Sequence, residues 1–379
     1  MTIGTEHEYS LNDHDFRPLP INDRIIQRIN GSVVNEFPYG PVNLSKELQK
    51  HVIEIVPAVP AKDVVELEGM VYSGLQKLQN QLGSDIKMLG LGMHPLLELP
   101  QTEVWDHDDK EIYETYDRLF GIHQHGWLNI QALQMNLPFR NDDELVSIYN
   151  RVRSLTPFLV AVAASSPYVE GKVTGKIDNR LLYYRENQRQ LPIISHGVIP
   201  EKLRSKQDYL DTQEEMYAAL RKEGAGILCH EWVDSRGLIV RFSRNCVEIK
   251  ALDEQESVRS DMAITAFVLA LLRCDLRLEE DEGALKAMLE KAIDKGTADL
   301  KPELQALYQK ALNAASKEER RYLPLIRTKI ECGSLAEAML ERARTREEIM
   351  GMLPELERSL RTNVPYQCDK CKTNSISLY

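Results

Sequence analysis

Acidic residues lie on short apolar segments of this chain at a spacing that places them on one face of a strand. In the predicted strand 2–11, Glu6 and Glu8 share a face and lie roughly 7 Å apart, because side chains alternate along a strand. Two carboxylates at that separation repel each other unless a cation lies between them. The pair is a candidate cation site, although a single strand glutamate more often faces solvent.

Glu54 is a second candidate, because both faces of its predicted strand, 51–56, are apolar. Ile53 and Ile55 occupy one face, and Val52 and Val56 flank Glu54 on the other. A carboxylate buried among such side chains is costly unless it is paired or binds a metal. We therefore predict that Glu54 is a buried acid.

Two more predicted strands carry ionisable side chains on one face: 123–130, with His123 and His125, and 246–252, with Glu248 and Lys250. A lone strand histidine is more often a hydrogen-bonded core residue than a metal ligand. Four such strands, with acids in excess, favour one shared face that binds a hard divalent cation. Oxygen ligands suit Mg²⁺ or Mn²⁺, and Mg²⁺ commonly accompanies nucleotide phosphates, so the residues predict a metal and phosphate site on a sheet.

The elements that must position these residues belong to an α+β fold. A further strand is predicted at 86–92, and helices at 61–82, 142–164, 212–223 and 257–273, with several more between 281 and 360. This pattern predicts an antiparallel or mixed sheet packed by helices. Because it becomes almost wholly helical near residue 257, we expect a catalytic sheet-and-helix domain at 1–256, a helical region at 257–363 packed on it, and a tail at 364–379.

Composition excludes several classes of protein. The net charge of −11 and the dispersed basic residues do not resemble a nucleic-acid binder. The longest apolar stretches fall short of the roughly 20 residues that span a bilayer, and the N-terminus has no signal-peptide pattern. Scattered cysteines fit a reducing compartment, so we expect a cytoplasmic protein that does not bind membranes. Cys368 and Cys371 form a single Cys-x-x-Cys, which we interpret as a solvated tail because a structural zinc site needs four ligands.

The generic nucleotide-binding loops are absent from the sequence: it has neither a Walker A motif nor a Gly-x-Gly-x-x-Gly after a strand. Six other motifs follow one another between residue 3 and about residue 256: GTEHEYSL, ELQKHVIEIVPAV, LGLGMHP, GIHQHGWLNI, AASSPYVEGKVTGKIDNR and RFSRNCVEIKALD. In this order they resemble the glutamate–cysteine ligases of the second bacterial and archaeal type and related carboxylate–amine ligases. Each motif alone is weak, but six in order are specific.

The resemblance implies a glutamine-synthetase-like antiparallel sheet whose concave face binds ATP and Mg²⁺. It implies these metal ligands: Glu6, Glu8, Glu47, Glu54, His123 and Glu248. It also implies that Arg180, Arg241 and Lys250 are catalytic residues that contact the phosphates or a substrate carboxylate. Three positions depart from the family pattern. Lys250 replaces an arginine and cannot make its bidentate fork, His7 replaces an acid, and Trp127 stands where the pattern has glycine, which leaves the role of His125 open.

The reaction implied by the resemblance joins a carboxylate to an amine. ATP first phosphorylates the carboxylate, and the amine then displaces phosphate, so the protein mainly positions the substrates and neutralises charge. The expected substrates are L-glutamate and an amine such as L-cysteine, as in glutathione biosynthesis. A ligase with another carboxylate or amine, and a non-catalytic ATP or metal sensor on the same sheet, are the alternatives. The sequence leaves a homo-oligomer open.

Overall fold

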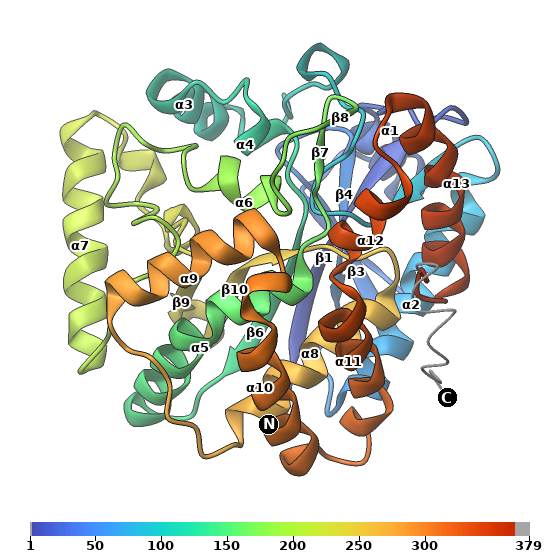
Figure 1. Cartoon of the computed structure of the whole chain (residues 1–379). Coiled ribbons are helices and arrows are strands. Elements are labelled where there is room, and N and C mark those ends of the chain that lie inside the picture. The colour runs from blue at the N-terminus through green and yellow to red at the C-terminus, as the bar shows by residue number, and fades with distance from the viewer. Residues whose placement is uncertain (1, 368–379) are drawn as a thin grey trace.

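The computed structural model describes residues 2–367 and is built on one large antiparallel sheet (Figure 1). Its strands lie in the order β2-β3-β4-β1-β6-β10-β9, and β5 also pairs with β1. The strands are β1 (Gly4–Asn12), β2 (Glu36–Tyr39), β3 (Val42–Lys46), β4 (Val52–Pro57), β5 (Lys87–Leu89), β6 (Ala132–Pro138), β9 (Leu238–Arg241) and β10 (Cys246–Asp253). A separate small hairpin consists of β7 (Tyr168–Val169) and β8 (Lys172–Val173). The predicted α+β class is confirmed.

The predicted strands that carry acidic residues are confirmed, whereas the predicted strand that carries His123 and His125 is wrong. Segments 2–11, 51–56 and 246–252 are confirmed as β1, β4 and β10, whereas 86–92 contributes only the short β5. The predicted strand 123–130 is wrong, because this segment forms a loop and the one-turn helix α4 (His125–Leu128). The N–H groups of Trp127 and Leu128 donate to the carbonyl of Gln124 and close a helical turn. The strand between β1 and β10 is β6, farther along the chain.

Three long helices pack on or behind the apolar face of the sheet: α2 (Val64–Leu82), α5 (Asp142–Ala163) and α8 (Val258–Leu272). All three begin at a side-chain N-cap, from Asp63, Asn141 and Ser257, which accepts hydrogen bonds from N–H groups of the first turn. Helix α8 is buried along almost its whole length, because it packs between α2 and α5 on one side and the C-terminal helices on the other. These helices confirm the predictions at 61–82, 142–164 and 257–273.

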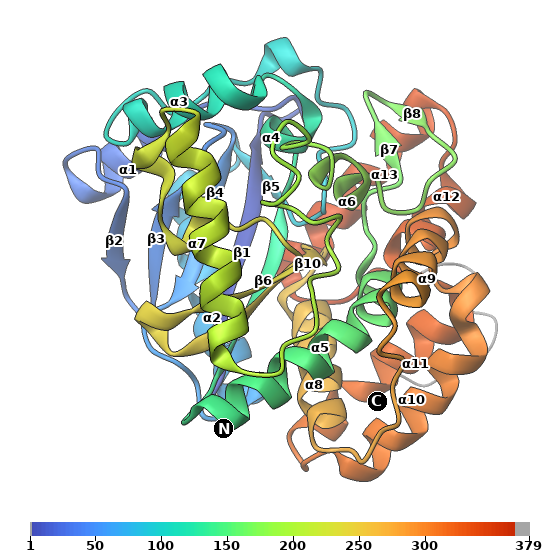
Figure 2. The same ribbon diagram turned by 90° about the vertical axis from the view of Figure 1, so that its left-hand side faces the viewer.

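The remaining helices surround this core. They are α1 (Asn22–Asn30), α3 (Lys110–Phe120), α6 (Asn179–Tyr184), α7 (Lys206–Lys222), α9 (Glu282–Lys295), α10 (Lys301–Ala314), α11 (Leu323–Cys332), α12 (Leu335–Arg342) and α13 (Arg346–Thr362). Figure 2 shows α9 to α13 (orange to red) gathered on the right, and β2, β3 and β4 (blue) on the left. The predicted domain boundary near residue 257 stays a prediction, and the tail cysteines Cys368 and Cys371 lie outside the described residues.

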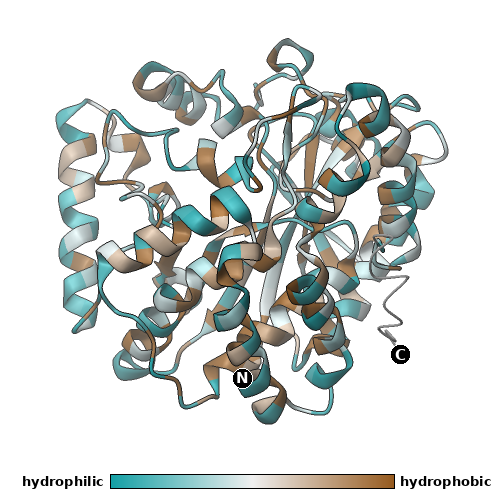
Figure 3. Ribbon diagram, viewed as in Figure 1, coloured by the Kyte–Doolittle hydropathy of each residue, from teal (hydrophilic) through white to brown (hydrophobic). Residues whose placement is uncertain are grey.

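Hydropathy along the helices follows their packing. In Figure 3 the helices at the front of the molecule mix hydrophilic (teal) and hydrophobic (brown) residues, as helices with one buried face do. No helix within residues 2–367 is both long enough and apolar enough to cross a membrane.

Two glycines explain how the segment after β5 passes close to the end of β10. A Cβ atom on Gly90 would lie 2.2 Å from the carbonyl oxygen of Gln255, and one on Gly92 would lie 2.2 Å from the carboxyl carbon of Asp253. Any side chain at either position would therefore collide with this segment. Glycine at both positions is therefore required for this close packing.

Candidate active site

A cavity of about 330 Å³ lies on the polar face of the sheet. Strands β1, β4, β6, β9 and β10 contribute side chains to it, and α3, α4 and α6 contribute to its sides. The charged residues that line it are Glu6, Glu8, Glu47, Glu54, Arg180, Arg241, Arg244, Glu248 and Lys250. The structure therefore brings together all the predicted site residues except His123.

One end of the cavity, which we call the carboxylate end, consists of Glu8, Glu47 and Glu54. One oxygen from each residue can be chosen so that all three lie within 4.8 Å of one another. Glu8 and Glu54 face each other across β1 and β4, and Glu47 follows β3 directly. Glu8 accepts hydrogen bonds of 2.8 Å from the Ala132 backbone N–H and from the Gln134 side chain. These contacts fix its carboxylate but leave acceptor positions free.

Burial dominates the electrostatics of the carboxylate end. It raises the pKa of Glu8 to about 8, with a further contribution from the charge on Glu47. Burial also raises the pKa of Glu54 well above its usual range, and Glu6 and Glu47 raise it further. The pKa of Glu47 is raised by burial too. Within residues 2–367, no basic side chain forms an ion pair with any of the three. The nearby Lys46, Arg241 and Arg244 form ion pairs with other carboxylates.

A second group of carboxylates adjoins the first, at what we call the arginine end, and these carboxylates are already paired. Glu6 forms an ion pair with the Arg244 guanidinium and accepts a 2.9 Å hydrogen bond from the Asn136 amide. Although burial opposes it, Arg244 and Asn136 together lower the pKa of Glu6. Glu248 accepts a 2.8 Å hydrogen bond from Nη1 of Arg241. The protein itself therefore supplies the compensating charge here.

Arg180 and Lys250 keep free hydrogen-bond donors in the cavity, and Nε of Arg241 also has no hydrogen-bond partner within the described residues. Arg180 is 2% exposed, and its Nε and Nη1 have no hydrogen-bond partner among residues 2–367. The Lys250 ammonium forms no hydrogen bond or ion pair within the same described range. Burial opposes its charge, but Tyr184 and Glu248 raise the pKa of Lys250 above its usual value. The two side chains can therefore bind an anion.

The histidines do not join this cluster. His123 is exposed in the loop before α4 and does not line the cavity. The strand predicted at 123–130 is wrong, whereas the metal-ligand role that the family resemblance implies for His123 stays a prediction. His125 is buried in α4, where its Nε2 lies 3.3 Å from Glu170. His7 points to the other face of β1, and its Nδ1 lies 3.2 Å from Glu254. Position 7 does not face the cavity, so the replacement of the family acid by His7 removes no carboxylate from it.

Several residues that line the cavity or hold its carboxylates were not predicted from the sequence. Gln134 and Asn136 on β6 hold Glu8 and Glu6, and they show the same alternation of polar and apolar residues that identified the other strands. Arg244 follows β9 in a 3-10 turn, and nothing in its local sequence indicates a partner 238 residues away. Four aromatic residues also line the cavity: Tyr116, Trp127, Tyr184 and Trp232.

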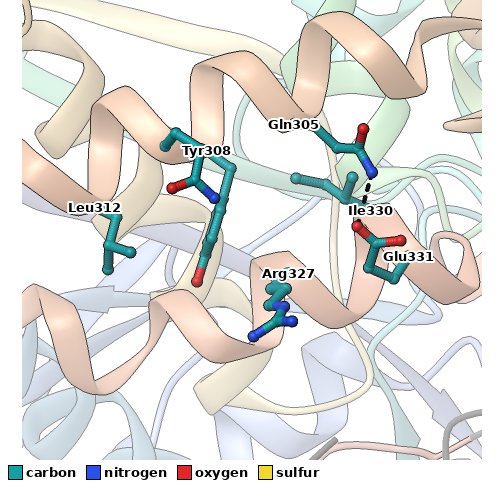
Figure 4. A pocket seen from close by; sticks show the side chains of 7 residues that line it. Gln305, Tyr308, Leu312, Arg327, Ile330 and Glu331 are labelled. Atoms are coloured by element: carbon teal, nitrogen blue, oxygen red, sulfur yellow. Dashed lines mark hydrogen bonds between the residues drawn. The ribbon is translucent and has the colours of Figure 1, made fainter. Parts of the chain in front are cut away.

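A second hollow, of about 430 Å³, lies between α10 and α11, far from these residues in the sequence (Figure 4). Gln305, Tyr308 and Leu312 of α10 line it opposite Arg327 and Glu331 of α11. Gln305 donates 2.9 Å to Glu331. This hollow is larger than the cavity on the sheet but gathers no group of unpaired acids or cations, so we place the chemistry on the sheet.

The fold that carries this cavity occurs in solved ligases. The structure is similar to the glutamate–cysteine ligase of Francisella tularensis, solved in complex with AMP, with a TM-score of 0.68 and 13% identity over 99% of this chain and 91% of that one. It is also similar to a bifunctional glutathione synthetase of Pasteurella multocida, with a TM-score of 0.65 and 13% identity over 94% of this chain and 52% of that one. The chain thus has the fold of a glutamate–cysteine ligase.

Sequence comparison identifies the family. The model of glutamate–cysteine ligase family 2 matches residues 2–357, so the chain belongs to this family and is a carboxylate–amine ligase that acts on small molecules. An uncharacterized protein of Archaeoglobus fulgidus is 48% identical over 366 residues, which cover 96% of this chain and all of that protein. A protein of Rubrobacter xylanophilus, provisionally named glutamate–cysteine ligase 2-1, is 25% identical over 94% of this chain and 85% of its own length.

Proposed function

We propose that this protein is an ATP-dependent, ADP-forming ligase that activates L-glutamate as an acyl phosphate and joins it to an amine such as L-cysteine. One observation carries the proposal: a single cavity holds unpaired carboxylates at one end and the free donors of Arg180 and Lys250 nearby. The AMP bound by the Francisella ligase, which shares this fold, supports nucleotide use.

The carboxylate end fits a divalent cation. Glu8, Glu47 and Glu54 offer hard oxygen ligands, are largely buried, and form no ion pair within the described chain. We propose that they hold Mg²⁺, with Glu6 and Glu248 at the border of the site. When bound, Mg²⁺ neutralises charge on the phosphate oxygens of the nucleotide.

The side chains of the protein would bind and orient the substrates rather than react with them. In the first step a carboxylate oxygen of the substrate attacks the γ-phosphorus of ATP, and ADP leaves. In the second step the amine nitrogen attacks the acyl carbon, phosphate leaves, and the nitrogen loses a proton. Arg180 and Lys250 would bind the oxyanions whose charge grows or moves in these steps.

Product analysis tests this reaction directly. The pure protein is incubated with ATP, MgCl₂ and L-glutamate, and single amines are added in turn. We expect ADP and inorganic phosphate in equal amounts, only when both the carboxylate and the amine are present. AMP and pyrophosphate would exclude an acyl phosphate, and ATP binding without turnover in any combination would identify a non-catalytic binding protein.

The replacement of the family arginine by Lys250 favours one alternative, a ligase with a different carboxylate or amine. A lysine offers a point charge where an arginine offers two parallel donors, so the bound anion can differ in shape. A panel of dicarboxylic amino acids and of amines, compared by kcat/KM, separates the two proposals. L-glutamate with L-cysteine should give the highest value if the first proposal is correct.

A further inference from the structure

Arg180 lies in the first turn of α6, at the end of a long loop that is tied to the end of β10. The loop runs from the end of α5 to α6, and Asp178 caps α6 by accepting 2.8 Å from the N–H of Leu181. The Arg180 N–H donates 3.1 Å to the hydroxyl of Ser166, near the start of the same loop. The first turn of α6, which carries Arg180, is thus fixed to both the end and the start of the loop.

One edge of the Arg180 guanidinium is hydrogen-bonded, and its Cζ lies 5.6 Å from the centre of the Tyr184 ring. Nη2 donates 2.9 Å to the carbonyl of Lys250 on β10, while Nε and Nη1 have no hydrogen-bond partner among residues 2–367. Nη1 lies 3.7 Å from Oδ1 of Asp253, a charge contact that is longer than a hydrogen bond. A guanidinium in this position is attracted by a fixed charge and still has donors for a ligand.

Asp253 is built to stay in place. Its Oδ2 accepts a 2.9 Å hydrogen bond from the Ser165 N–H and a 2.7 Å hydrogen bond from the Ser166 hydroxyl. The residue is fully buried. Its Oδ1 accepts no hydrogen bond within the described residues and is the oxygen nearest to Arg180. The serines therefore fix one oxygen of the carboxylate, and the other is left for the guanidinium.

We propose that Asp253, oriented by Ser165 and Ser166, is a positioning residue that sets the Arg180 guanidinium to bind a substrate oxyanion in the cavity. The inference rests on the proposed function for the nature of that oxyanion, which is a phosphate of ATP or the carboxylate of the amino acid. Asp253 itself contacts no substrate in this proposal. Its carboxylate opposes rotation of the guanidinium, which a neutral side chain of the same shape would not do.

The test uses Asp253→Asn, which keeps the shape and one acceptor oxygen but removes the charge opposite Arg180. Calorimetric titrations with Mg²⁺ and ADP, and separately with L-glutamate, measure binding without turnover. We expect the affinity for one of the two ligands to fall at least about tenfold, and the ligand affected identifies the oxyanion. In an Arg180→Ala background the same change should alter that affinity less than about twofold.

A chemical rescue adds a measurement that a merely structural role would not change. Guanidinium chloride at a non-denaturing concentration should restore part of the activity of Arg180→Ala, because Asp253 attracts the added ion. Rescue should be much weaker in Arg180→Ala/Asp253→Asn. Asp261→Asn is the matched control, since Asp261 is equally buried but lies on α8 beside His7, and it should leave both affinities unchanged.

Equal ligand affinities in wild type and folded Asp253→Asn, or equal rescue with and without Asp253, would overturn the inference. If Asp253→Asn does not fold, Ser166→Ala is measured in the same way and should lower the affinity several-fold, and an unchanged affinity there also overturns it. A wild type that binds ADP but turns over no substrate would contradict the proposed function alone, because the binding experiment still decides the role of Asp253.

Discussion

The two ends of the cavity contain the same residue type on the same sheet but differ in charge compensation. At the arginine end, Glu6 and Glu248 are paired with Arg244 and Arg241. At the carboxylate end, Glu54 and its two neighbours form no ion pair within residues 2–367. Removing the partner of a paired buried acid destabilises the folded protein, whereas an unpaired buried acid already lowers the stability of the folded protein.

This difference separates acids that serve the fold from acids that await a ligand. The pKa of Glu6 is lowered although it is buried, because Arg244 and Asn136 stabilise its charge. The pKa of Glu54 is raised by the same burial, since other carboxylates surround it. Sequence alternation alone treats the two residues alike. Their roles differ because of the neighbours that the sheet brings to each.

The largest expected effect comes from Glu54→Gln compared with Glu248→Gln. Glu54→Gln replaces a buried acid that no cation compensates with a neutral side chain of the same shape, so the metal-free protein should be as stable or more stable, while turnover falls by about 100-fold or more. Glu248→Gln removes the 2.8 Å ion pair of Arg241, which keeps only a 3.7 Å contact with Glu231, and should destabilise the metal-free protein by about 3 kcal/mol. Thermal melts in EDTA and in excess Mg²⁺ with an ATP analogue measure both effects.

The sign of the stability change decides this comparison. The metal-induced increase in melting temperature should be lost in Glu54→Gln. If Glu54→Gln destabilises the metal-free protein as much as Glu248→Gln does, Glu54 is a structural acid. An intact metal-induced increase together with normal turnover would remove Glu54 from the site.

Lys250→Ala should have the next largest effect, on the chemical step. Lys250 is a partly buried cation with a raised pKa and no hydrogen-bond partner in the described chain, and we propose that it binds the transferring phosphoryl group. We expect kcat to fall about 100-fold with little change in ADP affinity, while Lys250→Arg retains much of the activity. Single-turnover kinetics and calorimetry separate the two quantities. Normal turnover by Lys250→Ala would show that this position takes no part in the reaction.

A smaller effect is expected from pH. Glu8, with a pKa of about 8, and Glu54 hold protons in the folded metal-free protein that they release in the unfolded chain, where their pKa is about 4.5. Stability in EDTA should therefore fall as pH rises from about 5 to about 8. A cation requires the ionised carboxylates, so affinity for Mn²⁺ should rise over the same range, with proton release. Glu54→Gln should flatten both slopes relative to wild type, and parallel slopes would contradict the assignment.

Alternation along single strands was enough to predict much of the carboxylate end. Glu8 and Glu54 were placed on the cavity face from a period of two residues, and β1 and β4 confirm those strands. Glu47 came only from the resemblance to the family, since it follows the end of β3 and shows no alternation of its own. The strand predicted at 123–130 failed because a histidine spacing of two also fits a loop that enters a short helix.

The arginine end could not be predicted in the same way. Arg244 reaches Glu6 because β10 and β6 lie between the turn after β9 and β1, so that segments 238 residues apart meet. Which carboxylate an arginine pairs with depends on strand order, and single-strand periodicity does not contain strand order. The position of Asp253 beside Arg180 depends on loop packing against β10, which is equally non-local.

The smallest expected effect comes from Arg244→Gln, and it has an unusual sign. The Arg244 side chain is 45% exposed, so its pair with Glu6 should contribute less than about 1 kcal/mol to stability. Without Arg244, Glu6 would become one more unpaired carboxylate in the cavity and resemble Glu54. We therefore expect the affinity for Mn²⁺ in the absence of nucleotide to rise by about two- to fivefold, because the substitution removes a positive charge that competes with Mn²⁺ for Glu6.

Arg140→Gln is the matched control, because Arg140 forms an exposed pair with Glu144 at the start of α5 and should not change the affinity for Mn²⁺. Titration followed by electron paramagnetic resonance of free Mn²⁺ measures both variants. A weaker or unchanged affinity in Arg244→Gln would show that Glu6 serves only its arginine. A rise would show that Arg244 and a divalent cation compete for Glu6, so that the boundary between the two ends is set by charge and not by the position of the strands.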